Sequence, residues 1–240
     1  MQNSSDGFAR RFGEVYQHQW IYGDGSIDLV AEIGKIAAAG IELAEQLGMQ
    51  DLNIDEGGFR MFRPMNPENG MDTLVLLERY DNLQVWAAAE CAAQTSTLWM
   101  KAILDNQSNE HTWLGEGSHM LDDALDAPRD ISSDRIAVDW VCYNPTKQAA
   151  LVDFPLLVRE LSAVLHESGF DETAVRYFGM TTAAGPDLNL AHIWLEHSSA
   201  AVMGEVLAWR QSAPELRDWR HHLNSLHGEI RAHHMLVQVD

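Results

Sequence analysis

The feature that most limits how this chain can fold is an internal repeat. The segments LVLLERYDNLQVWAAAE (74–90) and AHIWLEHSSAAVMGEVL (191–207) each pass from an apolar run through Leu-Glu into a polar turn, then into apolar residues at helical spacing. Glu78 and Glu196 stand at the same place in the two patterns, 118 residues apart in a chain of 240. A separation of about half the chain predicts that one folding unit occurs twice.

The hydrophobic pattern of the first half predicts the element order β-α-β-β-α-β. Short aromatic or β-branched runs with turn signals between them indicate the strands, and apolar residues at a period near 3.6 indicate the helices. The predicted strands are 14–22, 52–65, 72–80 and 111–121, and the predicted helices are 27–49 and 83–104.

The second half repeats this order. Its predicted strands are 135–143, 173–182, 188–197 and 228–239, and its predicted helices are 147–169 and 200–226. Pro155 and Pro214 fall inside these helices and are expected to bend or split them. We therefore predict one unit over 1–122 and another over 135–240, joined by an acidic linker, 123–134, that contains Pro128.

A β-α-β-β-α-β unit folds as a four-stranded antiparallel sheet with both helices on one face. The other face of a single unit would present aromatic side chains to water, which is unfavourable. Two units remove this exposure when they pack their bare faces together. The predicted fold class is therefore α+β, with tandem ferredoxin-like repeats whose antiparallel sheets form a barrel within one chain.

Two motifs resemble a known family. HIWLEHSSAAVMGEVLAWRQSAPELRDWRHHL (192–223) is similar to the third strand and second helix of the dimeric α+β barrel superfamily, especially its NIPSNAP-like branch, and VDWVCYNPTK (138–147) is similar to its first strand. The first half resembles the family mainly in element order. The resemblance implies a small-molecule site within the barrel or between sheet and helices. Members include cofactor-free monooxygenases, polyketide cyclases, muconolactone-type isomerases, and haem enzymes such as chlorite dismutases.

The charge balance excludes some partners. Lys and Arg number 16 and Asp and Glu 36, a formal charge of −20, which disfavours nucleic acids and anionic membranes as partners. No apolar run approaches the roughly 20 residues of a membrane span, and the first residues contain no apolar signal segment. Cys91 and Cys142 form no CxxC motif, as is usual in a reduced compartment. We expect a cytoplasmic protein that is a monomeric pseudo-dimer or a homodimer.

Strand alternation assigns side chains to the two faces of each predicted strand. We expect the barrel interior to receive four catalytic candidates, His18, Asp139, His192 and Glu196, and five substrate-binding candidates, Trp20, Tyr22, Tyr143, Trp194 and His234 (or its neighbour His233). A one-residue slip in register would reverse any of these assignments. Packed sheets can also hold such residues as an ordinary, fully hydrogen-bonded core. His192 and Glu196 on a strand lie about 13 Å apart, so we predict no metal site there. Metal ligands brought together from different strands, such as His18, His192 and His234, are an open alternative.

These residues favour an enzyme acting on a hydrophobic, aromatic or polyketide-like molecule in the barrel. His18 or His192 would act as the base, with Tyr22, Tyr143 and Glu196 positioning the substrate. Oxygenation, cyclisation and isomerisation without a cofactor, as in natural-product biosynthesis, all fit, because each begins with loss of a proton from an activated carbon or phenol. Two alternatives stay open: a haem protein with this fold, and a non-catalytic NIPSNAP-like binding or interaction protein.

Overall fold

The structure is a computed structural model of the 240-residue chain. It describes residues 15–23, 25–26, 28–46, 59–66, 72–80, 83–107, 111–121, 136–144, 152–181, 191–226 and 229–239. The predicted linker, 123–134, lies outside the described residues. In the described part of the chain, no helix is both long enough and apolar enough to cross a bilayer.

The described strands and helices follow the predicted order. The strands are β1 (Val15–Gly23), β2 (Phe59–Pro64), β3 (Asp72–Tyr80), β4 (His111–Leu121), β5 (Ala137–Asn144), β6 (Thr173–Thr181), β7 (Ala191–His197) and β8 (Glu229–Val239). The helices are α2 (Leu29–Gln46), α3 (Leu83–Thr95), α4 (Thr97–Gln107), α5 (Phe154–Glu167), α6 (Ala200–Ser212) and α7 (Arg217–Ser225), with a short 3₁₀ turn, η5 (Pro214–Leu216).

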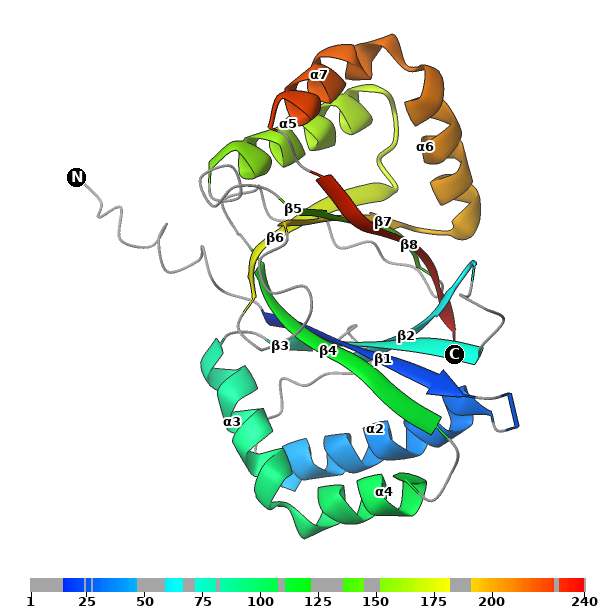
Figure 1. The fold of residues 1–240 in the computed structure, drawn as a ribbon, viewed down its shortest axis with the longest axis vertical. Coiled ribbons are helices and arrows are strands. Elements are labelled where there is room, and N and C mark those ends of the chain that lie inside the picture. The colour runs from blue at the N-terminus through cyan, green and yellow to red at the C-terminus, as the bar shows by residue number, and fades with distance from the viewer. Residues whose placement is uncertain are drawn as a thin grey trace, which may run out of the picture.

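The strands form one closed antiparallel barrel in the order β1-β3-β2-β8-β5-β7-β6-β4. Strands β4, β1, β3 and β2 are neighbours in the first half, and β8, β5, β7 and β6 take the corresponding positions in the second. The halves meet where β2 pairs with β8 and where β4 pairs with β6. Helices α2, α3 and α4 cover the outside of the first sheet, and α5, α6 and α7 cover the second (Figure 1). The predicted fold class is confirmed.

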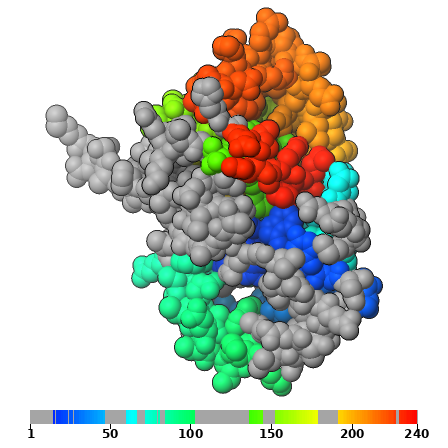
Figure 2. All heavy atoms as spheres, in the orientation of Figure 1, coloured from blue at the N-terminus to red at the C-terminus, as the bar shows by residue number. Residues whose placement is uncertain are grey.

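The interior of the barrel is an apolar core that both halves build. Phe62, Val75 and Leu77 of the first half pack in one cluster with Trp140 and Trp194 of the second. The two sheets also have separate cores under their helices. Strand β8 reaches the surface beside the helices of the second half (Figure 2).

Three helix predictions need comment. The helix predicted over 83–104 is broken at Ser96, whose Oγ accepts a hydrogen bond from the Trp99 backbone N–H at 3.2 Å and so caps α4. Pro155 does not split α5, because α5 begins at Phe154 and a proline is tolerated in the first turn. Pro214 does interrupt the last helical segment, between α6 and α7.

Candidate functional site

Trp140 is the centre of a cluster of rings inside the barrel. Its ring lies 4.8 Å from that of His18, 5.1 Å from those of Trp194 and His234, and 5.6 Å from that of His192. Trp20 also belongs to the cluster, with its ring 4.7 Å from His234. These are the separations of aromatic rings in contact. Among the described residues, the space around Trp140 is therefore occupied by packed rings.

Two histidines of this cluster, His18 and His234, have lowered pKa values. Burial, with the nearby His192 and His234, lowers the pKa of His18 to about 3. Burial and the charge of His233 lower the pKa of His234 to about 4. His192 Nδ1 accepts a hydrogen bond from Trp140 Nε1 at 2.9 Å, so its proton is on Nε2. An imidazole with such a low pKa is a weak base, which makes His18 a poorer general base than the sequence suggested.

Other predicted residues of the interior have partners of their own. Glu196 accepts a hydrogen bond from Arg176 Nη2 at 3.0 Å, and both side chains are almost completely buried. Cys142 Sγ lies 3.3 Å from His192 Nδ1. Tyr22 follows the parity of Trp20 on β1 and so belongs to the interior face, where it is half-buried. The described residues contain no group of three or more His, Cys, Asp or Glu side chains that could hold a metal ion.

Asp139 and Tyr143 are not in the interior, and their predicted orientation is wrong. Both point to the opposite face of β5, toward the helices of the second half, where Tyr143 packs against Phe154 with ring centroids 5.4 Å apart. Trp140 takes the interior position between them. The pattern misled because β5 is buried on both faces from Ala137 to Tyr143, so a polar residue does not mark the inner face.

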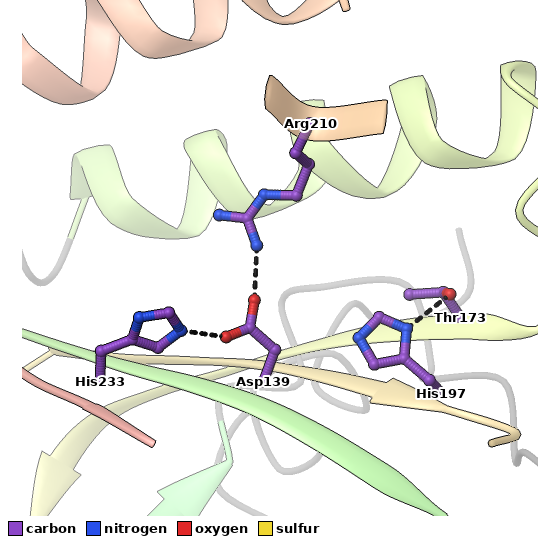
Figure 3. Close-up of polar contacts among 5 residues, drawn as sticks. All are labelled: Asp139, Thr173, His197, Arg210 and His233. Atoms are coloured by element: carbon purple, nitrogen blue, oxygen red, sulfur yellow. Dashed lines mark hydrogen bonds and ion pairs between the residues drawn. The ribbon is translucent and has the colours of Figure 1, made fainter. Parts of the chain in front are cut away.

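On this outer face Asp139 lies at the centre of a polar cluster, shown in Figure 3. Its Oδ2 accepts a hydrogen bond from Arg210 Nη1 of α6 at 2.5 Å, and its Oδ1 is hydrogen bonded to His233 Nε2 of β8. His197 of β7 lies on the other side of Asp139, with its Nδ1 2.9 Å from Thr173 Oγ1. Each residue comes from a different element, so only the folded barrel with α6 in place assembles the cluster.

Burial and charge act in opposite directions on Asp139. Burial alone would raise the pKa of its carboxyl, but the hydrogen bond from His233 and the charges of Arg210 and His233 hold that pKa below its usual value. The same hydrogen bond raises the pKa of His233, although partial burial opposes this. Asp139 is therefore ionised, and His233 titrates above its ordinary value of 6.5.

The cluster opens to solvent through its cations. The side chain of Asp139 is 1% exposed, whereas those of Arg210 and His233 are 22% and 44% exposed. Burial raises the pKa of Tyr143 to about 12, so its hydroxyl stays protonated. Burial lowers the pKa of His197 to about 4, so that ring is neutral. A buried carboxylate thus orients an accessible imidazole and an accessible guanidinium.

Few features of the sequence indicate this cluster. Arg210 lies within a predicted amphipathic helix, where a solvent-exposed arginine is ordinary, and His197 was not selected. His233 was considered only as an alternative to His234. The one available signal was Asp139 itself, because a carboxylate within an otherwise apolar strand must find a partner when it is buried.

Comparison with known proteins identifies the architecture. No known family model matches this sequence, and no curated protein sequence matches it. A solved structure of a candidate monooxygenase from Fusobacterium nucleatum is similar, with a TM-score of 0.55 at 10% identity over 95% of this chain and 93% of that one. The chain has the dimeric α+β barrel fold. A chlorite dismutase variant from Candidatus Nitrospira defluvii, in complex with cyanide, shares it with a TM-score of 0.54 at 10% identity over 98% of this chain and 95% of that one.

A second chlorite dismutase structure from that organism, in complex with imidazole, has a TM-score of 0.52 at 11% identity over 98% of this chain and 96% of that one. At these identities the likeness concerns the fold alone.

The likeness to these structures nevertheless overturns one expectation. A protein without any cofactor was predicted, yet structures that match almost the whole chain include chlorite dismutases, which are haem enzymes. The prediction that no cofactor is needed is therefore wrong as a general inference from this fold.

The described residues were tested for a haem site. Haem requires an axial ligand such as histidine beside an apolar slot as wide as the macrocycle. Inside the barrel, His18 and His192 are in ring contact with Trp140. Under the second-half helices, Phe154 and Leu157 are fully buried in a continuous core. Among the described residues, neither the barrel interior nor the core under the second-half helices forms such a slot, and we assign no haem ligand.

Proposed function

We propose that this protein is an enzyme that removes a proton from a small hydrophobic molecule, with His233 as the base and Asp139 as the group that orients it. The hydrogen bond between His233 Nε2 and the buried Asp139 carboxylate carries the proposal. It sets the tautomer of His233, since an ionised carboxylate only accepts and Nε2 must then bear the proton. Nδ1 is left as the basic atom, on a ring that is 44% exposed.

Proton transfer at this pair follows from its electrostatics. When His233 Nδ1 takes a proton, the Asp139 carboxylate stabilises the imidazolium that forms. This carboxylate is only 1% exposed, so solvent screens the interaction weakly. The pKa of His233 is raised by that contact, so the ring is a stronger base than an isolated histidine. This differs from the interior His18, whose pKa near 3 makes it a poor proton acceptor.

A reaction that requires only proton removal tests the proposal. The probe is phenylacetone in D₂O, whose benzylic hydrogens exchange with deuterium when a base removes them, followed by NMR. We expect His233→Gln to lower the protein-dependent exchange rate by about 100-fold, the usual contribution of a positioned base. His221→Gln on the exposed side of α7 is the matched control and should leave the rate unchanged. Equal rates for the wild type and His233→Gln would refute the assignment.

The pH profile gives an independent check. Only neutral His233 accepts a proton, so the exchange rate should rise with pH and reach half its plateau above 6.5, because the pKa of His233 is raised. Asp139→Asn removes the charge that raises this pKa and should move the half-point downward. An unchanged half-point in Asp139→Asn would show that a different group is the base.

Finer features of the function belong to the same proposal. The aromatic or polyketide-like character of the substrate, and a cyclisation or isomerisation as the reaction, are supported by the family resemblance of 192–223. That resemblance also supports placement near the NIPSNAP-like branch. The shared strand order of 1–122 and 135–240 supports an origin by duplication. Cys91 and Cys142, both free thiols, support a cytoplasmic location.

A further inference from the structure

We infer that the substrate of this site carries a carboxylate, which Arg210 binds beside His233. This rests on the proposed function and names its substrate class. Arg210 uses only Nη1 to hold Asp139. Within the described residues, its Nε and Nη2 have no hydrogen-bond partner. These two N–H groups form one edge of the guanidinium, and such an edge matches the two oxygens of a carboxylate.

The charges of the cluster point to an anion. When His233 is protonated, one carboxylate, that of Asp139, faces two cations, Arg210 and His233. The other titratable groups that face Asp139 are neutral, since His197 has a pKa of about 4 and Tyr143 one of about 12. The cluster then has one uncompensated positive charge, in a chain whose formal charge is −20. A monoanion would compensate it.

The accessible side of the cluster has the same sign. Asp139 is buried, whereas its two cationic partners, drawn around it in Figure 3, are 22% and 44% exposed. On the neighbouring helix α7, Arg220 Nη2 donates a hydrogen bond to the backbone carbonyl of Arg210. On β8, Arg231 is paired with Glu229 at 3.4 Å, and His234 is neutral. The two side chains of the cluster that solvent reaches, Arg210 and His233, are thus its cationic groups, which favours an anion beside them.

The carboxylate would also assist the proton transfer. A negative charge held on Arg210, close to His233, stabilises the imidazolium and raises the pKa of His233 further. The step balances without another reactant. His233 Nδ1 takes the proton from an acidic carbon, the C–H electron pair becomes a conjugated carbanion, and return of the same proton to a different carbon gives an isomer. The substrate class is thus an unsaturated organic acid whose acidic C–H lies next to a C=C bond.

Benzoate is the probe, with benzyl alcohol as its uncharged counterpart, and binding to the full chain is measured by calorimetry. We expect benzoate to bind and benzyl alcohol not to bind measurably. Arg210→Gln should weaken benzoate binding about tenfold or more, the usual effect of losing charge-assisted hydrogen bonds. Arg210→Lys keeps the charge but loses the planar edge, so its affinity for benzoate should lie between those of the wild type and Arg210→Gln. Arg217→Gln, an exposed arginine of α7, is the control and should bind like the wild type.

The His233 ring reports where the anion binds. In an NMR titration of the wild type, benzoate should raise the pKa of His233 and leave the ring signals of the exposed His166 in place. Binding should weaken as pH rises and His233 loses its proton. Equal affinities for benzoate in the wild type and Arg210→Gln, or an unmoved His233 pKa, would overturn the inference. If benzoate binds through Arg210 but His233→Gln exchanges phenylacetone hydrogens normally, the anion site stands and the proposed base falls.

Discussion

At the scale of single residues, the structure separates two kinds of histidine. His18 and His197 are almost completely buried, and burial lowers their pKa values to about 3 and about 4. His233 is accessible and bonded to a carboxylate, which raises its pKa. The same side chain is thus a neutral packing element where it is deeply buried, and a titrating group where it is accessible and hydrogen bonded to a carboxylate.

The buried histidines make stability depend on pH. The unfolded chain takes up a proton at His18 below pH 6.5, whereas the folded chain does so only near pH 3. The stability is therefore fully present above 6.5 and is lost as pH falls, by about 1.4 kcal/mol per pH unit for each such group. His18→Phe keeps a ring against Trp140 and removes the titration. In urea unfolding between pH 6 and 4, the free energy of unfolding of this variant should fall less steeply than that of the wild type. The difference in slope should correspond to about one proton taken up on unfolding. Equal slopes would contradict the low pKa of His18.

At the scale of elements, the sequence predicted β5 but not which of its faces is the inner one. Its length and apolar content were enough to predict a strand. The orientation could not be obtained, because the barrel interior and the layer under α6 bury β5 equally, from Ala137 to Tyr143. Alternation distinguishes faces only where one is wet. In β1 the interior positions of His18 and Trp20 were predicted.

Helix α6 carries Arg210 to Asp139, and its start is fixed by a cap. Ser199 has extended backbone geometry and its Oγ accepts a hydrogen bond from the Val202 N–H at 3.2 Å. Ser199→Ala should lower the free energy of unfolding by about 1 kcal/mol, and Ser199→Asp, another good cap, should cost much less. Urea titrations measure both. Because Ser199 lies at the opposite end of α6 from Arg210, both variants should bind benzoate normally if the Arg210 site is correct.

At the scale of the whole molecule, the repeat that suggested the fold was matched one residue out of step. Glu78 faces the helices, where it accepts a hydrogen bond from Tyr80, whereas Glu196 faces the interior. Tyr22 and Tyr143 also lie on opposite faces. The fold prediction was confirmed, because the order of elements does not depend on a one-residue shift between the two halves. The predicted orientations of Asp139 and Tyr143 were wrong, because a one-residue shift assigns every side chain of a strand to the opposite face of the sheet.

Closure of the barrel predicts that the two halves unfold together. Phe62 of β2 is 1% exposed and packs in the interior cluster with Trp140 and Trp194 of the other half, and β2 is hydrogen bonded to β8. Phe62→Ala should therefore cost about 3–5 kcal/mol. Native-state hydrogen exchange should show the same loss of protection in the slowest amides of β1 and β3 as in those of β5 and β7. Leu156→Ala, at an exposed position of α5, is the control and should change neither set. If β5 and β7 kept their protection in Phe62→Ala, the two halves would be independent folding units. In a core built by both halves, the cavity left by Phe62 must lower the stability of both.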